Sequence, residues 1–153
     1  MFEVFARELG KSEEELLRAV ALSDLVTIHQ KAGIGRLSAY CGAISAGCGA
    51  GAGIAYLQGG KAHAVAHTVV NAIAILSGTI CDGAKPSCAA KIASAVDAGI
   101  LGYQMYLEGQ QFYGGDGIVT KGVDNTVRNV GILAREGMRQ TDKTILEIML
   151  SND

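Results

Sequence analysis

A run of small residues between Leu37 and Leu57 limits the possible folds more than any other stretch. It contains five glycines and six alanines within 21 residues. Each glycine inside a helix costs up to about 1 kcal/mol relative to alanine. A helix here is therefore stable only if it is buried on all sides, with glycines where neighbouring backbones approach closely. The stretch predicts a buried central helix that other helices surround.

Apolar residues with helical spacing predict further helices on both sides of this run. The pattern predicts helices over about 2–9, 13–31, 61–77, 86–107 and 124–136, and a last one from Thr141 or Asp142 onward. Ser12 followed by Glu15 fits a capping box at the start of the second helix. Its predicted core-facing residues are Leu16, Leu17, Val20, Leu25 and Ile28. The glycine-rich residues 108–123 predict a loop.

No segment shows convincing strand alternation, so the predicted class is all-α. We expect a compact bundle of about six or seven helices with a buried Gly/Ala-rich central helix and glycine-rich loops. With 49% hydrophobic and 18% charged residues, the composition excludes a disordered chain. A length of 153 residues suits one domain, so residues 1–153 are predicted to form a single all-helical domain.

Charge and hydropathy exclude several functional classes. The net charge of −2 gives no support to binding of nucleic acid or of an anionic membrane. The apolar run from His67 to Ile80 is too short and too interrupted to span a bilayer. No signal peptide is visible after Met1, so we expect a cytoplasmic protein. Its four cysteines are then expected to be reduced, metal-binding or catalytic rather than paired in disulfides.

Two of these cysteines lie between Gly78 and Ile92, together with the only proline, Pro86. Cys81 is predicted in a turn and Cys88 in the first turn of the following helix, where backbone N–H groups favour a thiolate. Lys85 also favours ionised thiols nearby. The spacing, however, matches neither a zinc ribbon nor a ferredoxin. From the residues alone, buried structural cysteines remain the alternative.

Two weaker patterns each leave two interpretations open. His63 and His67 are four residues apart and can lie on one helix face as metal ligands. No carboxylate accompanies them, so ordinary solvated side chains are the alternative. The loop from Gly114 to Gly117 is either flexible or an anion-binding nest beside Lys121, Asp124 and Arg128.

Three blocks of the sequence resemble a known family. They are Cys81–Cys88, Gly117–Gly131 with the following Gly137-Met138, and Ser38–Ala43. The chain resembles the iron–sulfur L-serine dehydratase alpha-chain superfamily, and most closely its L-cysteine desulfidase-like branch. It resembles only the C-terminal part of these longer proteins, so we expect a fragment of such a catalytic domain.

The resemblance implies an enzyme that needs no PLP. It implies a lyase of the L-serine ammonia-lyase or L-cysteine desulfidase type, with an oxygen-sensitive [4Fe–4S] cluster. Carried over by position, Cys41, Cys81 and Cys88 are the expected cluster ligands, whereas Cys48 is expected in the core. Lys85 is the expected catalytic residue. The expected substrate-binding residues are Ser38, Gly83, Lys121 and Asp124.

The expected partners are a small amino-acid substrate and either a second copy of the chain or a segment that supplies the N-terminal part. No nucleic acid or membrane is expected. One alternative is a non-catalytic helical subunit, or a truncated fragment, that needs a partner chain. Another is a zinc protein that uses His63, His67 and cysteines. The sequence leaves open whether serine or cysteine is the substrate.

Overall fold

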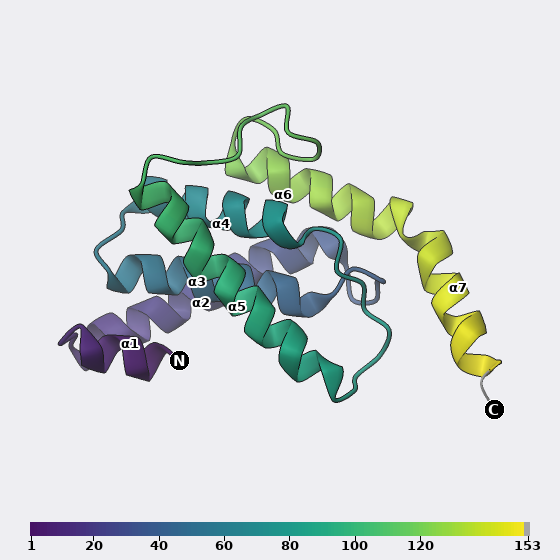
Figure 1. Ribbon diagram of the computed structural model, residues 1–153, viewed down its shortest axis with the longest axis horizontal. Helices are drawn as coiled ribbons and strands as arrows, with labels where there is room; N and C mark the ends of the chain where they lie inside the picture. Colours follow the sequence, from purple (N-terminus) through teal and green to yellow (C-terminus); the bar gives the residue numbers. More distant parts are fainter. Residues whose placement is uncertain (152–153) are drawn as a thin grey trace.

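The computed structural model describes residues 1–151 and is mainly helical (Figure 1). The helices are α1 (Phe2–Glu8), α2 (Glu13–Ile34), α3 (Gly42–Leu57), α4 (Ala62–Leu76), α5 (Ser87–Leu107), α6 (Val123–Ile132) and α7 (Arg139–Leu150). A π-helical turn, Leu133–Gly137, joins α6 to α7. Within residues 1–151 there is no strand, only an isolated antiparallel bridge between Tyr40 and Ile80. The predicted all-α class is confirmed.

Helix α3 is the buried centre of the bundle, as its glycine content predicts. Twelve of its sixteen residues are buried, and α2, α4 and α5 pack around it. A Cβ atom added at Gly51 would lie 2.6 Å from the Cα atom of Gly99 in α5. A Cβ atom at Gly49 would lie 2.4 Å from the carbonyl oxygen of Ser23 in α2. Glycine therefore allows two neighbouring backbones to touch α3 directly.

The prediction of which α2 residues face the core is wrong for the larger side chains. Leu17, Leu25 and Ile28 are 61%, 64% and 62% exposed, whereas Ala19, Ser23, Gln30 and Ile34 are buried. The reason is that the backbones of α2 and α3 lie close together at Gly49. This leaves room there only for small or polar side chains of α2. Thr27 Oγ1 donates to the carbonyl oxygens of Ser23 and Ser45, at 2.8 and 3.3 Å. The predicted capping box of Ser12 and Glu15 is confirmed.

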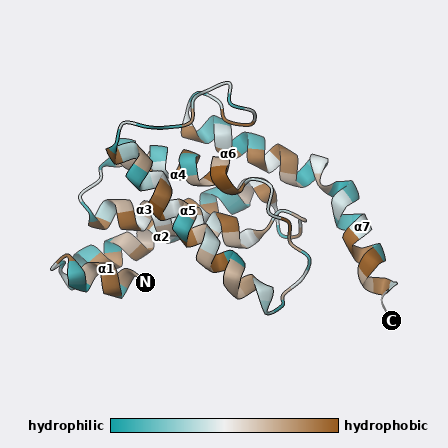
Figure 2. Cartoon of the chain, in the orientation of Figure 1, coloured by the Kyte–Doolittle hydropathy of each residue, from teal (hydrophilic) through white to brown (hydrophobic). Residues whose placement is uncertain are grey.

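Two predicted helix boundaries are also wrong. The central helix begins at Gly42 rather than near Leu37, because the preceding segment is extended and Tyr40 pairs with Ile80. The last helix begins at Arg139 rather than at Thr141 or Asp142, because the π-helical turn Leu133–Gly137 leads almost directly into it. Helix α7 runs from a hydrophilic first turn to hydrophobic last turns (Figure 2). None of the helices described for residues 1–151 has the length and apolar character needed to cross a membrane.

Candidate functional site

The isolated bridge places Cys41 and Cys81, which are forty residues apart in the sequence, on adjacent backbone segments. The Cys41 N–H donates to the carbonyl oxygen of Thr79 at 3.2 Å, and the Cys81 N–H donates to that of Ala39 at 2.6 Å. Cys41 is buried at the N-cap of α3, and Cys81 packs half-buried against the same core. The structure therefore brings these two thiol-bearing residues together by main-chain pairing.

Cys88 joins this region from the first turn of α5. Its Sγ atom lies 3.6 Å from the carbonyl oxygen of Gly83. Gly83 has a φ of 92°, a left-handed conformation that favours glycine. The turn that begins at Cys81 therefore folds back against the start of α5. Cys88, in the first turn of α5, lies against the Gly83 carbonyl oxygen of this turn. Helix α7 reaches the same turn, since a Cβ atom at Gly83 would lie 3.8 Å from Met149 Cε.

Asp82 holds two lysines at this turn. Lys91 Nζ donates to Asp82 Oδ1 at 2.8 Å and to the carbonyl oxygen of Ile80 at 2.9 Å. Lys85 Nζ forms an ion pair with the other carboxylate oxygen. The bond to Asp82 raises the pKa of Lys91, and negative charge on Cys41 and Cys88 raises it further. Lys91 is thus the cation that lies near both thiols.

Sequence reasoning missed both Asp82 and Lys91. The available signal was weak: Lys91 follows Cys88 by three residues, which places both side chains on one face of a helix. Lys85, the lysine named from the sequence, lies on the more exposed side of Asp82. Its side chain is 43% exposed, against 23% for Lys91.

The ion pairs of Asp82 with Lys85 and Lys91 predict how this turn responds to acid. Hydrogen bonds from Lys85 and then Lys91 lower the pKa of Asp82 from its usual 3.8 to about 2. Because the pKa is lowered in the folded state, the carboxylate stabilises the turn above about pH 4, and this support is lost as the pH falls toward 2. A carboxyl ¹³C titration should show the low midpoint. Lys91→Met should raise it, and an unchanged midpoint in that variant would contradict the assignment.

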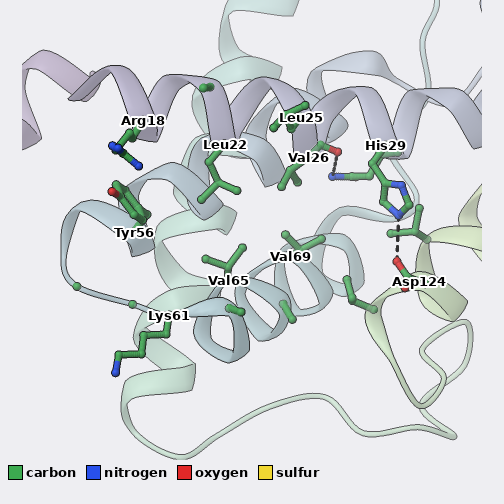
Figure 3. A pocket seen from close by; sticks show the side chains of 18 of the residues that line it. Arg18, Leu22, Leu25, Val26, His29, Tyr56, Lys61, Val65, Val69 and Asp124 are labelled. Carbon is green, nitrogen blue, oxygen red and sulfur yellow. Dashed lines mark hydrogen bonds and ion pairs between the residues drawn. The ribbon is translucent and has the colours of Figure 1, made fainter. Parts of the chain in front are cut away.

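A groove of about 860 Å³ lies between α2, α4 and the start of α6. Leu22, Leu25 and Val26 of α2 face Val65 and Val69 of α4 across it (Figure 3). Arg18, Tyr56 and Lys61 lie at one end. At the other end His29 Nε2 lies 3.1 Å from Asp124 Oδ1. The groove is thus apolar along its length and polar at both ends.

A second hollow, of about 550 Å³, lies between α4 and the glycine-rich loop. Its lining includes His63, His67, Gln111, Tyr113 and Lys121. None of the cysteines lines either hollow. The cysteine-bearing region and the two hollows are therefore separate features of the molecule.

Comparison with known proteins identifies the family. Residues 2–147 match the family described as serine dehydratase alpha chain. This chain belongs to the serine dehydratase alpha chain family. The family resemblance of the three sequence blocks is thereby confirmed.

Relatives in this family carry uninformative names. A UPF0597 protein of Desulfitobacterium hafniense is 65% identical over 147 residues, which cover 96% of this chain and 34% of the relative. UPF0597 proteins of Treponema denticola and Lachnoclostridium phytofermentans are 48% and 52% identical, over 97% and 96% of this chain and 35% of each relative. The chain spans about a third of the length of these relatives. No solved structure matches it.

The residues predicted from the serine dehydratase resemblance fall in different places. Cys41, Cys81, Cys88, Gly83 and Lys85 lie on the bridged segments and the turn that follows. Ser38 Oγ accepts from the Tyr40 N–H at 3.0 Å and donates to the carbonyl oxygen of Ala134 at 2.9 Å, so it ties the extended segment to the π-helical turn. Asp124 lines the groove and Lys121 lines the second hollow. Substrate binding by Ser38, Gly83, Lys121 and Asp124 stays a prediction.

Thiolate sulfur suits an iron–sulfur cluster, and Cys41 and Cys81 lie on adjacent backbone segments. All four cysteines are free. The buried hydroxyl of Tyr40 finds no hydrogen-bond partner among the described residues, and burial raises its pKa. Across residues 1–151, however, no three His, Cys, Asp or Glu side chains are arranged to hold a single metal ion. Cys48 is buried in the core, as predicted.

Proposed function

We propose that this chain is the cysteine-bearing helical part of an iron–sulfur lyase. The reaction is elimination of water from L-serine or of hydrogen sulfide from L-cysteine, without PLP. Water then hydrolyses the resulting aminoacrylate to pyruvate and ammonia. The observation that carries the proposal is the Tyr40–Ile80 bridge, because it places Cys41 and Cys81 on two paired backbone segments, diagonal to each other. Membership of the serine dehydratase alpha chain family supports the reaction class.

Cys41, Cys81 and Cys88 are the residues that would hold a [4Fe–4S] cluster in this proposal. Thiolate sulfur is the usual protein ligand of such clusters. When bound, a cluster with one iron free of protein ligands supplies a Lewis acid to the substrate. The Lys91 ammonium lies one helical turn after Cys88 and is held by Asp82, so it offsets negative charge at the site.

The two lysines have different roles in this proposal. Lys91 is held by both Asp82 and the carbonyl oxygen of Ile80, so it is the fixed cation. Lys85 has Asp82 as its partner and is the more exposed of the two. Lys85 is therefore the one that can leave Asp82 and bind the carboxylate of an amino acid. Asp82 remains paired with Lys91 when this happens.

The second candidate is a helical subunit that requires the rest of the family chain. Two observations favour it: the chain spans about a third of its relatives, and an open apolar groove runs between α2 and α4. In this candidate the groove receives an apolar helix from the remaining two thirds of the family protein. Acidic residues at one end of that helix would meet Arg18 and Lys61.

Pyruvate formation tests both candidates. The chain is reconstituted anaerobically with iron and sulfide and assayed with L-serine and L-cysteine. The assay is run with and without the part of the Desulfitobacterium hafniense relative that lies outside the matched region. We expect pyruvate from one substrate, and Lys85→Met should raise KM because it removes the cation for the carboxylate. Reconstituted protein that forms no pyruvate in either arm would contradict the lyase proposal.

Two exposed leucines of α2 distinguish the candidates. Leu25 lines the groove and Leu17 does not, although their exposures, 64% and 61%, are nearly equal. If the groove receives the rest of the family chain, Leu25→Asp should abolish the gain in turnover from the added part, and Leu17→Asp should leave it. Full turnover by this chain alone would contradict the second candidate.

A further inference from the structure

The two histidines of α4 are unused by the proposed lyase chemistry, and they face each other closely. His63 and His67 lie one helical turn apart, with their Nε2 atoms 3.2 Å from each other. Their ring centroids are 4.3 Å apart and the rings are tilted by 51°. Cysteines line no part of the second hollow, to which these histidines belong. The pair is therefore a feature distinct from the cysteine region.

The separation of the two nitrogens suits a shared metal ion. Zinc binds histidine nitrogen at about 2.0–2.1 Å. Two such bonds to nitrogens 3.2 Å apart enclose an angle of about 100° at the metal. This angle lies between the right angle of square-planar sites and the tetrahedral angle of zinc sites.

Outer contacts hold both rings in place. The Tyr106 hydroxyl lies 3.4 Å from His63 Nδ1, and the side chain of Gln111 lines the same hollow as His67. The Tyr106 ring also stacks on His67, with centroids 5.6 Å apart and planes 25° apart. Metal-binding histidines usually use the second ring nitrogen in such a bond, which fixes the ring and its tautomer. The hydrogen bond to Tyr106 leaves Nε2 of His63 free to bind a metal when Nδ1 carries the proton.

We propose that His63 and His67 form a two-histidine site for a divalent transition-metal cation of the zinc, nickel or copper class. Imidazole is a ligand that suits these metals. No third His, Cys, Asp or Glu joins the pair among residues 1–151, so the remaining coordination positions are taken by water or a small ligand. These positions lie at the second hollow, which has room for such a ligand, and Lys121 in its lining favours an anionic one.

A shared proton is the competing explanation of the 3.2 Å separation, since one imidazole can donate to the other. The two explanations differ in what happens when metal is added. A metal replaces that hydrogen bond and binds both Nε2 atoms at once. A pair that only shares a proton leaves both rings unchanged when zinc is added at protein concentration.

Ring NMR of the full 153-residue chain tests the site, because the chain has only three histidines. Zinc is titrated into protein with reduced thiols while the ¹⁵N signals of the three rings are followed. We expect the Nε2 signals of His63 and His67 to move together and to saturate at one equivalent, while His29 stays fixed. His63→Ala and His67→Ala should each lower zinc affinity at least about tenfold, the smallest loss expected even for an outer-shell partner. His29→Ala is the matched control and should not change it.

Two further experiments distinguish zinc binding by the histidines from zinc binding by thiols and from a loss of folding. Zinc also binds thiols, so the titration is repeated with Cys81→Ser/Cys88→Ser, in which the histidine shifts should persist. Far-UV circular dichroism checks folding, and His67→Gln replaces His67→Ala if the latter loses helix. Ring signals that do not move at one equivalent, shifts that vanish with the thiols, or equal losses in the His29→Ala variant would each overturn the proposal.

Discussion

Gly51→Ala is expected to destabilise the fold by about 3 kcal/mol or more, at the upper end of typical overpacking costs. The added methyl group would lie 2.6 Å from Gly99 Cα and 3.0 Å from the Gly99 carbonyl carbon and oxygen. These are backbone atoms, so no side-chain rotation relieves the clash. Helices α3 and α5 must separate, which opens the most extensive helix contact of the bundle. Urea unfolding followed by circular dichroism measures the loss.

Gly78→Ala is the matched control for this prediction. Gly78 has an ordinary backbone conformation, and an added Cβ atom would meet nothing within 4 Å. Its free energy of unfolding should change by less than about 1 kcal/mol, as for most substitutions outside packed contacts. Equal stability of the Gly51→Ala and Gly78→Ala variants would show that α3 and α5 do not pack through their glycines.

Cys81→Ser is expected to abolish retention of an iron–sulfur cluster. Cys81 is half-buried and its backbone N–H is held by a hydrogen bond to the carbonyl oxygen of Ala39, so serine can replace it with little change in packing. The hydroxyl is a much poorer iron ligand than the thiolate at neutral pH. Cys41→Ser and Cys88→Ser should have the same effect. Iron content after gel filtration, measured anaerobically, reports the loss.

Cys48→Ala is the control within the same set of residues. Cys48 is 1% exposed on α3, and burial raises the pKa of its thiol to about 12. Cys48 lies seven residues after Cys41, about 10 Å further along α3, so it lies outside the proposed ligand set and this variant should retain the cluster. Loss of iron from Cys48→Ala, together with full retention by Cys81→Ser, would show that the ligand set is wrong.

The helical framework could be predicted from sequence because its signals are local. The glycines of residues 42–53 made a buried α3 the only stable arrangement, and the Ser12–Glu15 box fixed the start of α2. Pro86 marked the start of α5. The buried side of α2 could not be predicted by apolar periodicity, since Gly49 draws Ser23 and Thr27 rather than leucines toward the core.

The cysteine region was predictable only in part. The sequence identified Cys41, Cys81 and Cys88 through a family resemblance, because their spacing alone is uninformative. The Tyr40–Ile80 bridge is a single pair of residues and leaves no alternation pattern to detect. Asp82 and Lys91 interact across nine residues and a change of chain direction, so their contact follows from the turn at Gly83 rather than from any motif.

The iron and acid-labile sulfide content of the anaerobically reconstituted chain tests the proposed cysteine ligand set most directly. A chain that binds a [4Fe–4S] cluster should hold about four iron and four sulfide atoms after removal of unbound metal. The Cys41→Ser/Cys81→Ser/Cys88→Ser variant, treated identically, should hold almost none. If the two proteins retain equal iron, with or without the rest of the family chain supplied, these three cysteines do not bind a cluster and the lyase proposal loses its structural basis.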